Sequence, residues 1–143
     1  MKPYPHQCPN CRKPTVRLVV GEYSADVEHD GRAYSLTISD LPVQTCSACC
    51  HRTLDRDSSN RVTEALRKAA GLLSPEQIRA SRTKLALTQK QLAERLQIGE
   101  ATLSRWETGA QIQQRAFDQM LKLYFALPEV RNYLEPTAVS QSI

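Results

Sequence analysis

The sequence contains no apolar run close to the roughly 20 residues that a membrane-spanning helix needs. Its first residues, MKPYPHQCPNC, lack the apolar core of a secretory signal peptide. We therefore expect a cytoplasmic protein with no membrane partner. Glycine-rich phosphate loops and nucleophile patterns are also missing, histidine occurs only three times, and the carboxylates are scattered along predicted helix surfaces. These absences predict that the chain is not an enzyme.

The 143 residues suffice for one ordinary domain or two small ones. A hydrophobic content of 41% with 24% charged residues is typical of a globular chain. The net charge of +4 is compatible with nucleic-acid binding but does not require it. The distribution of charge is more informative, because basic side chains outnumber acidic ones between residues 79 and 105. That segment holds Arg79, Arg82, Lys84, Lys90, Arg95 and Arg105 against Glu94 and Glu100.

Five cysteines in a cytoplasmic chain favour metal binding over disulfides. Four of them form two C-x2-C pairs, Cys8 with Cys11 and Cys46 with Cys49. Each such turn directs two thiolates at one point, and two turns supply the tetrahedral sulfur ligands of a structural zinc site. We therefore predict about one structural Zn²⁺ per chain, which stabilises the fold without catalysing a reaction, because a closed four-thiolate site has no open coordination position.

Other side chains near the pairs offer alternative ligands. Cys50 and His51 directly follow the second pair, and either can replace one of its cysteines. His6 and His29 are also available, although exposed polar histidines are the simpler interpretation. The symmetric two-residue spacing favours the four paired cysteines, which leaves Cys50 as a spare thiol.

The residues between the two pairs predict an antiparallel sheet. Segments 16–20, 23–28, 33–38 and 43–46 have β-branched or alternating patterns, and Asp30-Gly31 is a strong hairpin signal. A folded sheet brings the two cysteine pairs together although they are far apart along the chain. The N-terminal half is therefore expected to be a small zinc-bound antiparallel β domain.

A linker helix is expected after the second pair. The polar segment 55–60 can start this helix, and Gly71 ends it. An apolar stripe runs along it at Val62, Ala65, Leu66 and Ala69. We place the domain boundary near residues 72–73, which gives a zinc-binding domain with its linker helix at 1–71 and a second domain at 72–143.

Two capped helix starts follow the boundary. Ser74-Pro75-Glu76-Gln77 combines an N-cap, a proline in the first turn and a capping-box glutamine. Thr88 with Gln91 repeats the capping box. Helices are therefore predicted to begin just after Ser74 and just after Thr88.

Residues 87–109, LTQKQLAERLQIGEATLSRWETG, predict a helix, a tight turn and a second helix. Gly99 interrupts the apolar periodicity, Gly109 ends the second helix, and Leu103 and Trp106 face the core. Two short helices joined by such a turn form the DNA-reading helix-turn-helix unit. An ordinary helical hairpin has the same pattern.

The second helix of this unit would enter the major groove. Its outward side chains are polar or small and can address base edges; they are Glu100, Ala101, Thr102, Ser104 and Arg105. Gln89 starts the first helix of the unit, and polar groups at helix N-termini often bind phosphate. We therefore expect Gln89 to contact the DNA backbone.

Beyond Gly109, segment 115–127 predicts another helix, and Pro128 opens a short one. The helix over 115–127 has an apolar stripe that packs in the core or forms in part a dimer face. The stripe consists of Phe117, Met120, Leu121, Tyr124 and Phe125. Residues 136–143 are polar without periodicity, so a frayed tail is expected. The C-terminal half is thus an all-α domain of about five helices, and the chain is an α+β protein.

Two segments, LTQKQLAERL and TLSRWETG, resemble the Xre/Cro-type, lambda-repressor-like helix-turn-helix of phage and bacterial repressors. With CPNC at the front and CSAC before the linker helix, residues 6–134 resemble the MqsA (YgiT-type) antitoxins. The resemblance implies a zinc domain that neutralises an MqsR-like ribonuclease toxin. It also implies a C-terminal domain that forms a homodimer, binds a palindromic double-stranded DNA operator and represses its own operon.

The same resemblance implies roles for single residues. The zinc ligands would be Cys8, Cys11, Cys46 and Cys49. Arg105 matches the base-reading arginine of the recognition helix, but the family's asparagine falls at Ala101, which offers a thymine methyl contact in place of bidentate pairing with adenine. The operator is therefore expected to differ from the usual one. Arg67, on the linker helix, matches a basic position that touches phosphate, unless it is only a surface arginine.

Two other functions remain open. The chain can be a solitary, zinc-stabilised Xre-type transcription regulator without a toxin partner. Alternatively, a C-x-x-C pair can be a thioredoxin-like redox dithiol, which would make the protein an oxidoreductase. Two matched pairs without a βαβ pattern around either favour structural zinc.

Overall fold

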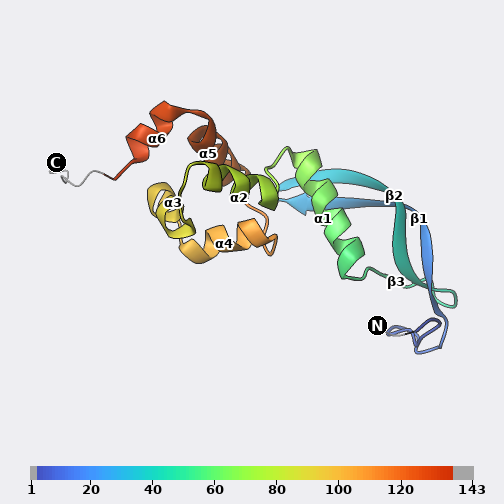
Figure 1. Ribbon diagram of the computed structural model, residues 1–143. Coiled ribbons are helices and arrows are strands. Elements are labelled where there is room, and N and C mark those ends of the chain that lie inside the picture. The colour runs from blue at the N-terminus through green and yellow to red at the C-terminus, as the bar shows by residue number, and fades with distance from the viewer. Residues whose placement is uncertain (1–2, 137–143) are drawn as a thin grey trace. The chain divides into compact units, whose positions relative to one another are not determined.

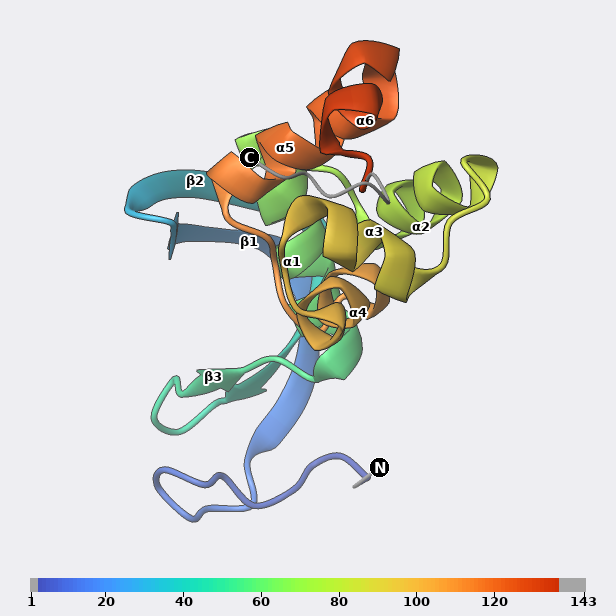
Figure 2. The same cartoon turned by 90° about the vertical axis from the view of Figure 1, so that its left-hand side faces the viewer.

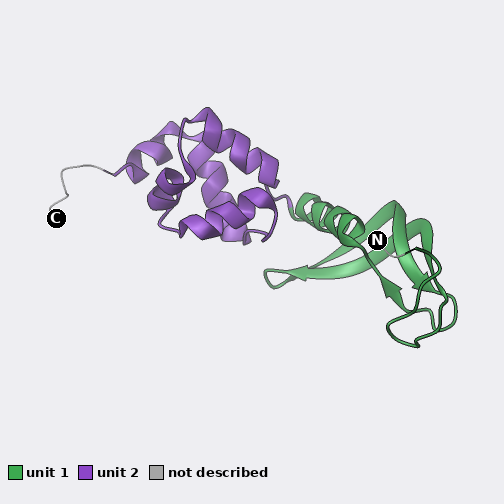
Figure 3. Cartoon of the chain, turned by 60° about the horizontal axis from the view of Figure 1, so that its bottom comes forward, with its two compact units in different colours: residues 1–70 green, residues 71–143 purple. Residues whose placement is uncertain are grey.

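The computed structural model describes residues 3–136 of the chain. They form a three-stranded antiparallel sheet followed by helices, so the predicted α+β class is confirmed (Figure 1). The chain divides between Ala70 and Gly71 into two compact units, called unit 1 and unit 2 below (Figure 3). The expected tail at 136–143 lies almost entirely outside the described residues. No helix among the described residues is long and apolar enough to cross a membrane.

Unit 1 is built on a long hairpin of β1 (Val16–His29) and β2 (Arg32–Cys46). The short β3 (Arg52–Thr53) pairs with Gln44 and Thr45 near the end of β2. The predicted Asp30-Gly31 turn is confirmed, since both residues have positive φ angles of 52° and 76°, as the tight hairpin turn requires. The last residue of β2, Cys46, pairs with Val16, the first residue of β1. The hairpin thus brings the two cysteine pairs to the same end of the sheet.

The expected division into four strands is wrong. Pairing between β1 and β2 continues through a register shift between Gly21 and Tyr23, where an irregularity bends the hairpin without ending it. On the partner strand, Asp40 adopts a positive φ of 53°. The short β3 was not predicted, because two residues carry no periodic signal.

Helix α1 (Arg56–Ala70) lies along the hairpin, as Figures 1 and 2 show. The Asp55 carboxylate caps it by accepting the backbone N–H of Ser58 at 2.8 Å. The apolar contact joins Ile38, Leu41 and Val43 of the sheet to Leu54, Val62 and Ala65. Gly71 ends α1 with a φ of 71°, as predicted. Ala69, which we expected in the apolar stripe, is exposed.

The described part of unit 2 contains five helices, in line with the prediction of about five for the C-terminal half. They are α2 (Pro75–Lys84), α3 (Gln89–Leu96), α4 (Glu100–Thr108), α5 (Arg115–Ala126) and α6 (Pro128–Leu134). The capping boxes at Ser74 and Thr88 are both confirmed. The buried core consists of Ile78, Leu92, Ala93, Leu103, Trp106, Leu121 and Tyr124.

Helices α3 and α4 are joined by residues 97–99. Gln97 closes α3 in the left-handed conformation with a φ of 59°, and Gly99 is the N-cap of α4, as predicted. Gly109 ends α4 with a φ of 86°. Leu103 and Trp106 are buried, so α4 turns its predicted core face inward. The opposite face of α4 is therefore directed to solvent.

A buried ion pair fixes α4 to α2. Two nitrogens of Arg82, Nε and Nη2, donate to the two carboxylate oxygens of Glu107, each at 2.8 Å, and the Glu107 side chain is almost fully buried. The Glu107 carboxylate raises the pKa of Arg82, so the guanidinium stays charged. Carboxylates were expected on helix surfaces. For Glu107 this expectation is wrong, because its side chain lies on the inward face of α4 and is buried.

Asp118 of α5 is a second buried carboxylate that we expected on a helix surface. It accepts the backbone N–H of Leu73 at 2.8 Å and the Gln113 side-chain amide at 3.0 Å, and it pairs with Lys122 at 2.8 Å. These contacts attach the segment just after Gly71 to α5. The position where the chain enters unit 2 is thus held by hydrogen bonds.

Candidate metal centre and nucleic-acid interface

The two cysteine pairs form turns of the same geometry. In the first, the backbone N–H groups of residues 10 and 11 lie 3.3 and 3.5 Å from the sulfur of Cys8. In the second, those of residues 48 and 49 lie 3.3 and 3.4 Å from the sulfur of Cys46. Each turn is closed by the residue after the pair, Arg12 or Cys50, which donates to the carbonyl of Cys8 or Cys46 at 2.9 Å and has a φ of 65° or 63°.

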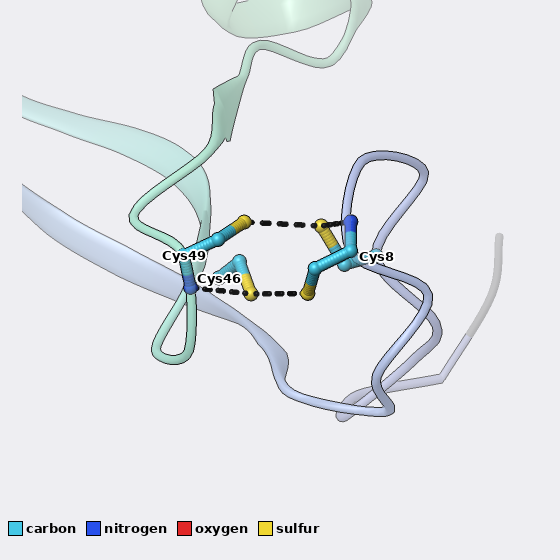
Figure 4. A group of neighbouring side chains, drawn as sticks. Cys8, Cys46 and Cys49 are labelled. Atoms are coloured by element: carbon cyan, nitrogen blue, oxygen red, sulfur yellow. Dashed lines mark hydrogen bonds between the residues drawn. The ribbon is translucent and has the colours of Figure 1, made fainter.

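Together the two turns bring four sulfur atoms within 4.8 Å of one another (Figure 4). The Cys8 and Cys49 sulfurs are 3.7 Å apart, and the Cys11 and Cys46 sulfurs are 3.6 Å apart. A tetrahedron with metal–sulfur bonds of about 2.3 Å has sulfur–sulfur edges of about 3.8 Å. Two sulfur pairs match this edge and all four sulfurs lie within 4.8 Å of one another, so the four predicted ligands could hold a metal ion.

Hydrogen bonds and burial shift the pKa values of three of the thiols, in opposite directions. The Thr15 hydroxyl, 3.1 Å from the sulfur, and then the Cys49 backbone N–H lower the pKa of Cys46 to about 6. The Asn10 side chain lowers the pKa of Cys49. A backbone hydrogen bond from Lys13 also lowers the pKa of Cys11, but burial and the neighbouring sulfurs outweigh it and raise that pKa to about 11. Thiolate, the form that binds metal, is therefore already favoured at two positions.

The same distances bear on the alternatives. All five cysteines are free thiols, and the sulfur separations far exceed the roughly 2.05 Å of a disulfide bond. Cys50 is exposed and lies outside the four-sulfur group, and His51 is not part of the group either. Among the described residues, this is the group of cysteine, histidine and acidic side chains that could hold a metal.

The exposed face of α4 carries the predicted base-reading residues. Glu100, Ala101 and Arg105 are exposed, whereas Thr102 and Ser104 are half-buried. Thr108 lies on the same exposed face, one turn beyond Arg105 and Ser104, and was not predicted. Thr108 could have been predicted from the sequence, because it lies four residues after Ser104 and residues four apart share a helix face.

Neither of the two predicted phosphate contacts is a fully exposed side chain. Gln89 is half-buried, and its side-chain amide donates to the Glu107 carboxylate at 3.3 Å. At the start of α3 the capping box pairs the backbone N–H of Gln91, which leaves the N–H groups of Gln89 and Lys90 without a partner inside the helix. Arg67, on α1, has only 8% of its surface exposed.

Sequence reasoning missed the two polar residues that contact the sulfurs. Asn10 sits inside the first turn, where its amide donates to the Cys49 sulfur at 3.4 Å. Thr15 precedes β1, and its contact with Cys46 depends on the register of the hairpin. Neither contact follows from cysteine spacing alone.

Comparison with known proteins assigns the chain to a family. No curated protein matches it. Residues 6–134, nearly the whole chain, match the family described as the antitoxin component of a bacterial toxin–antitoxin system, MqsA. The match spans both cysteine pairs and all of the helices, as the resemblance of the sequence implied. The chain therefore belongs to the MqsA family of antitoxins.

Proposed function

We propose that this antitoxin is a zinc-stabilised, homodimeric repressor that binds its own operator and neutralises an MqsR-like ribonuclease toxin. The observation that carries the proposal is the combination of a four-sulfur cluster in unit 1 with an exposed, polar α4 in unit 2, within one antitoxin chain. The protein acts in the cytoplasm, where operator DNA and the toxin are found. It binds its partners without catalysing a reaction.

In this proposal one structural zinc ion is bound by Cys8, Cys11, Cys46 and Cys49. Four clustered sulfur ligands favour zinc, and they leave no position for water or substrate. The ion replaces the large apolar core that unit 1 lacks, since its core clusters are small. Zinc therefore holds together the N-terminal turn and the end of the hairpin.

DNA recognition is assigned to α4. Arg105 is exposed and can donate two hydrogen bonds to the major-groove edge of guanine. Ala101 offers contact with a thymine methyl, and the neighbouring bases are read by Glu100, Thr102, Ser104 and Thr108. Because the Gln89 amide is engaged with Glu107, its phosphate contact is assigned to the backbone N–H groups at the start of α3. A phosphate contact by Arg67 of α1 would require this side chain, which is 8% exposed, to turn outward.

Dimerisation is assigned to α5. Phe117, Met120 and Leu123 repeat at helical spacing and are 39%, 40% and 45% exposed, respectively. Leu127 extends this apolar stripe at 42% exposure. Large apolar side chains that line up on one exposed face commonly mark an interface. A two-fold dimer presents two copies of α4, so the operator is a palindrome.

The toxin is assigned to the outer edge of β1 beyond Val16, which itself pairs with His6. In the sheet order β1-β2-β3, β1 is the outer strand, and its backbone can pair with a strand of another protein. Leu18, Val19 and Val20 are consecutive apolar residues on this strand and are 42–58% exposed. They supply apolar contacts beside the backbone pairing.

The test is a gel-shift titration of the DNA upstream of the gene with wild-type protein, Arg105→Ala and Lys84→Ala. We expect Arg105→Ala to lose about 1–3 kcal/mol of specific binding, which is about fivefold or more in affinity, because its bidentate contact is removed. Lys84 is an exposed cation outside α3 and α4, so its substitution controls for charge. Equal affinities for wild-type protein and Arg105→Ala would refute the assignment.

A further inference from the structure

A cavity of about 620 Å³ opens beside the first cysteine turn. Polar side chains from three separate segments surround it: His6 and Arg12 from the N-terminal segment, Gln44 from β2, and His51 and Thr53 from the region of β3. No aspartate or glutamate lines it. Its size is in the range of sites for small ligands, which are typically about 300–1,000 Å³.

The surroundings of the cavity are basic. Residues 3–21 and 41–54 contain no Asp or Glu, and their cations are Arg12, Lys13, Arg17 and Arg52. A fully ionised zinc–tetrathiolate carries a charge of about −2, so cations remain in excess at this end. The rest of the hairpin has the opposite character, because residues 22–40 carry five carboxylates and one cation. Charge is therefore segregated in unit 1, and all residues that line the cavity come from the basic segments 3–21 and 41–54.

The cavity wall combines hydrogen-bonding and ring surfaces. The Thr53 hydroxyl donates to the Gln44 carboxamide at 3.1 Å, which fixes both groups in the wall. The His6 ring is stacked on Tyr4 with 5.1 Å between ring centroids. Leu18 shares the sheet face of Val16, a lining residue, because side chains alternate along a strand. Since Leu18 is 42% exposed, an apolar surface continues from the cavity.

We propose that this cavity binds an unpaired nucleotide of a single-stranded nucleic acid. Arg12 contacts the phosphate, Gln44, His51 and Thr53 bond to the polar edge of the base, and the His6 ring supplies a stacking surface. A concave site admits one base that is free of its partner strand, whereas a duplex keeps its bases paired and stacked. The site is separate from α4, so this binding goes beyond operator recognition.

The excess of cations favours a nucleic acid over a protein segment. A single strand carries a phosphate at every nucleotide, so one phosphate can meet Arg12 in the cavity wall and others the exposed Lys13 and Arg17 nearby in the sequence, whereas Arg52 is stacked over Tyr23. RNA and single-stranded DNA share this chemistry. The choice between them is made by the measurement.

The experiment is a fluorescence-anisotropy titration of the zinc-loaded full chain with labelled hexauridylate RNA and hexathymidylate DNA. Excess unlabelled mixed-sequence duplex DNA is present throughout to occupy α4. We expect saturable binding of at least one oligonucleotide, which weakens with added salt. Tighter binding of hexauridylate identifies RNA as the source of the nucleotide, and tighter binding of hexathymidylate identifies single-stranded DNA.

Two variants and a matched control locate the binding. Arg12→Gln is expected to weaken it about fivefold, because one charged contact is lost. Thr53→Val keeps a β-branched side chain but removes the hydroxyl from the wall, so it is expected to weaken binding to a smaller extent. Arg32→Gln removes an exposed cation from the hairpin and should leave binding unchanged. Zinc content, measured on each preparation, checks that unit 1 is intact.

Three results would overturn the proposal. One is the absence of saturable binding of either oligonucleotide to the wild-type chain. Another is oligonucleotide binding that appears only when the duplex is left out, which would mean that α4 and not the cavity holds it. The third is an equal effect of Arg12→Gln and Arg32→Gln, which would reduce the interaction to general charge attraction.

Discussion

Replacing Glu107 with glutamine removes a buried charge and little volume. In the wild-type protein Glu107 is 1% exposed and receives three side-chain hydrogen bonds, two from Arg82 at 2.8 Å and one from Gln89 at 3.3 Å. After the substitution, the Arg82 guanidinium keeps its bond to the Leu87 carbonyl but has no counter-charge. Removing one partner of a buried pair costs about 3–5 kcal/mol, and we expect the lower end because glutamine retains some hydrogen bonding.

A loss of about 3 kcal/mol corresponds to a Tm that is lower by about 12–24 °C for a domain of this size. Trp106 is the single tryptophan of the chain and is 2% exposed in the core of unit 2, so its fluorescence reports unfolding of that unit. The assay is urea unfolding followed at Trp106. Glu94→Gln serves as the control, because Glu94 is an exposed carboxylate on α3 and should change stability by less than about 0.5 kcal/mol.

A double substitution tests whether the loss of stability comes from the unpaired charge of Arg82. Replacing Arg82 with methionine and Glu107 with leucine removes both charges together, and the free energy of unfolding should return close to the wild-type value. If Glu107→Gln costs no more than Glu94→Gln, the buried pair does not hold α4 as described.

Three further predictions concern the metal and the dimer. Purified protein should contain about one zinc per chain. The Cys49→Ser variant should lose this zinc, whereas Cys50→Ser should keep it. Metal analysis that finds equal zinc in both variants would contradict the ligand set. In the metal-free protein at about pH 8, iodoacetamide should alkylate Cys49 before Cys11, as followed by mass spectrometry, because the pKa of Cys49 is lowered while that of Cys11 is raised to about 11. Both thiols are half-buried, so a difference in burial class does not explain a difference in rate. Equal rates would mean that the sulfur hydrogen bonds are lost with the metal. Met120→Glu should convert the dimer to monomer in sedimentation analysis, whereas Gln119→Glu, at the neighbouring exposed position of α5, should not.

Local signals predicted most of the helix ends. The capping boxes at Ser74 and Thr88, the glycines that end α1 and α4, and the Asp30-Gly31 turn each depend on a few adjacent residues. Their chemistry is readable from the sequence because the hydrogen bonds involved span only two to four residues. The Gln97 cap of α3 was missed because a non-glycine residue adopts the left-handed conformation there.

Long-range pairing was less predictable. The structure has two long strands where four were expected, because β1 and β2 stay paired on both sides of the register shift between Gly21 and Tyr23. Glu107 and Asp118 look like surface carboxylates in a helical pattern, and their burial depends on Arg82 and on the Leu73 backbone, far away in sequence. Such contacts exist only once the tertiary structure has formed.

The candidate sites divide in the same way. Spacing alone predicted which cysteines come together, because a C-x2-C turn is a local structure. The partners that tune the sulfurs, Asn10 and Thr15, depend on the meeting of the two turns. On α4, helical spacing predicted the outward face, but it did not show that the Gln89 side chain turns toward Glu107.

The central claim is that this chain neutralises a toxin, and growth rescue tests it most directly. The gene adjacent to this one is induced alone or together with this chain, and colony-forming units and messenger RNA integrity are followed. We predict that the neighbour alone arrests growth and degrades RNA, and that co-expression restores growth with both proteins recovered in one complex. A neighbour that does not arrest growth, or an arrest that this chain does not relieve, would contradict the claim and favour a solitary regulator.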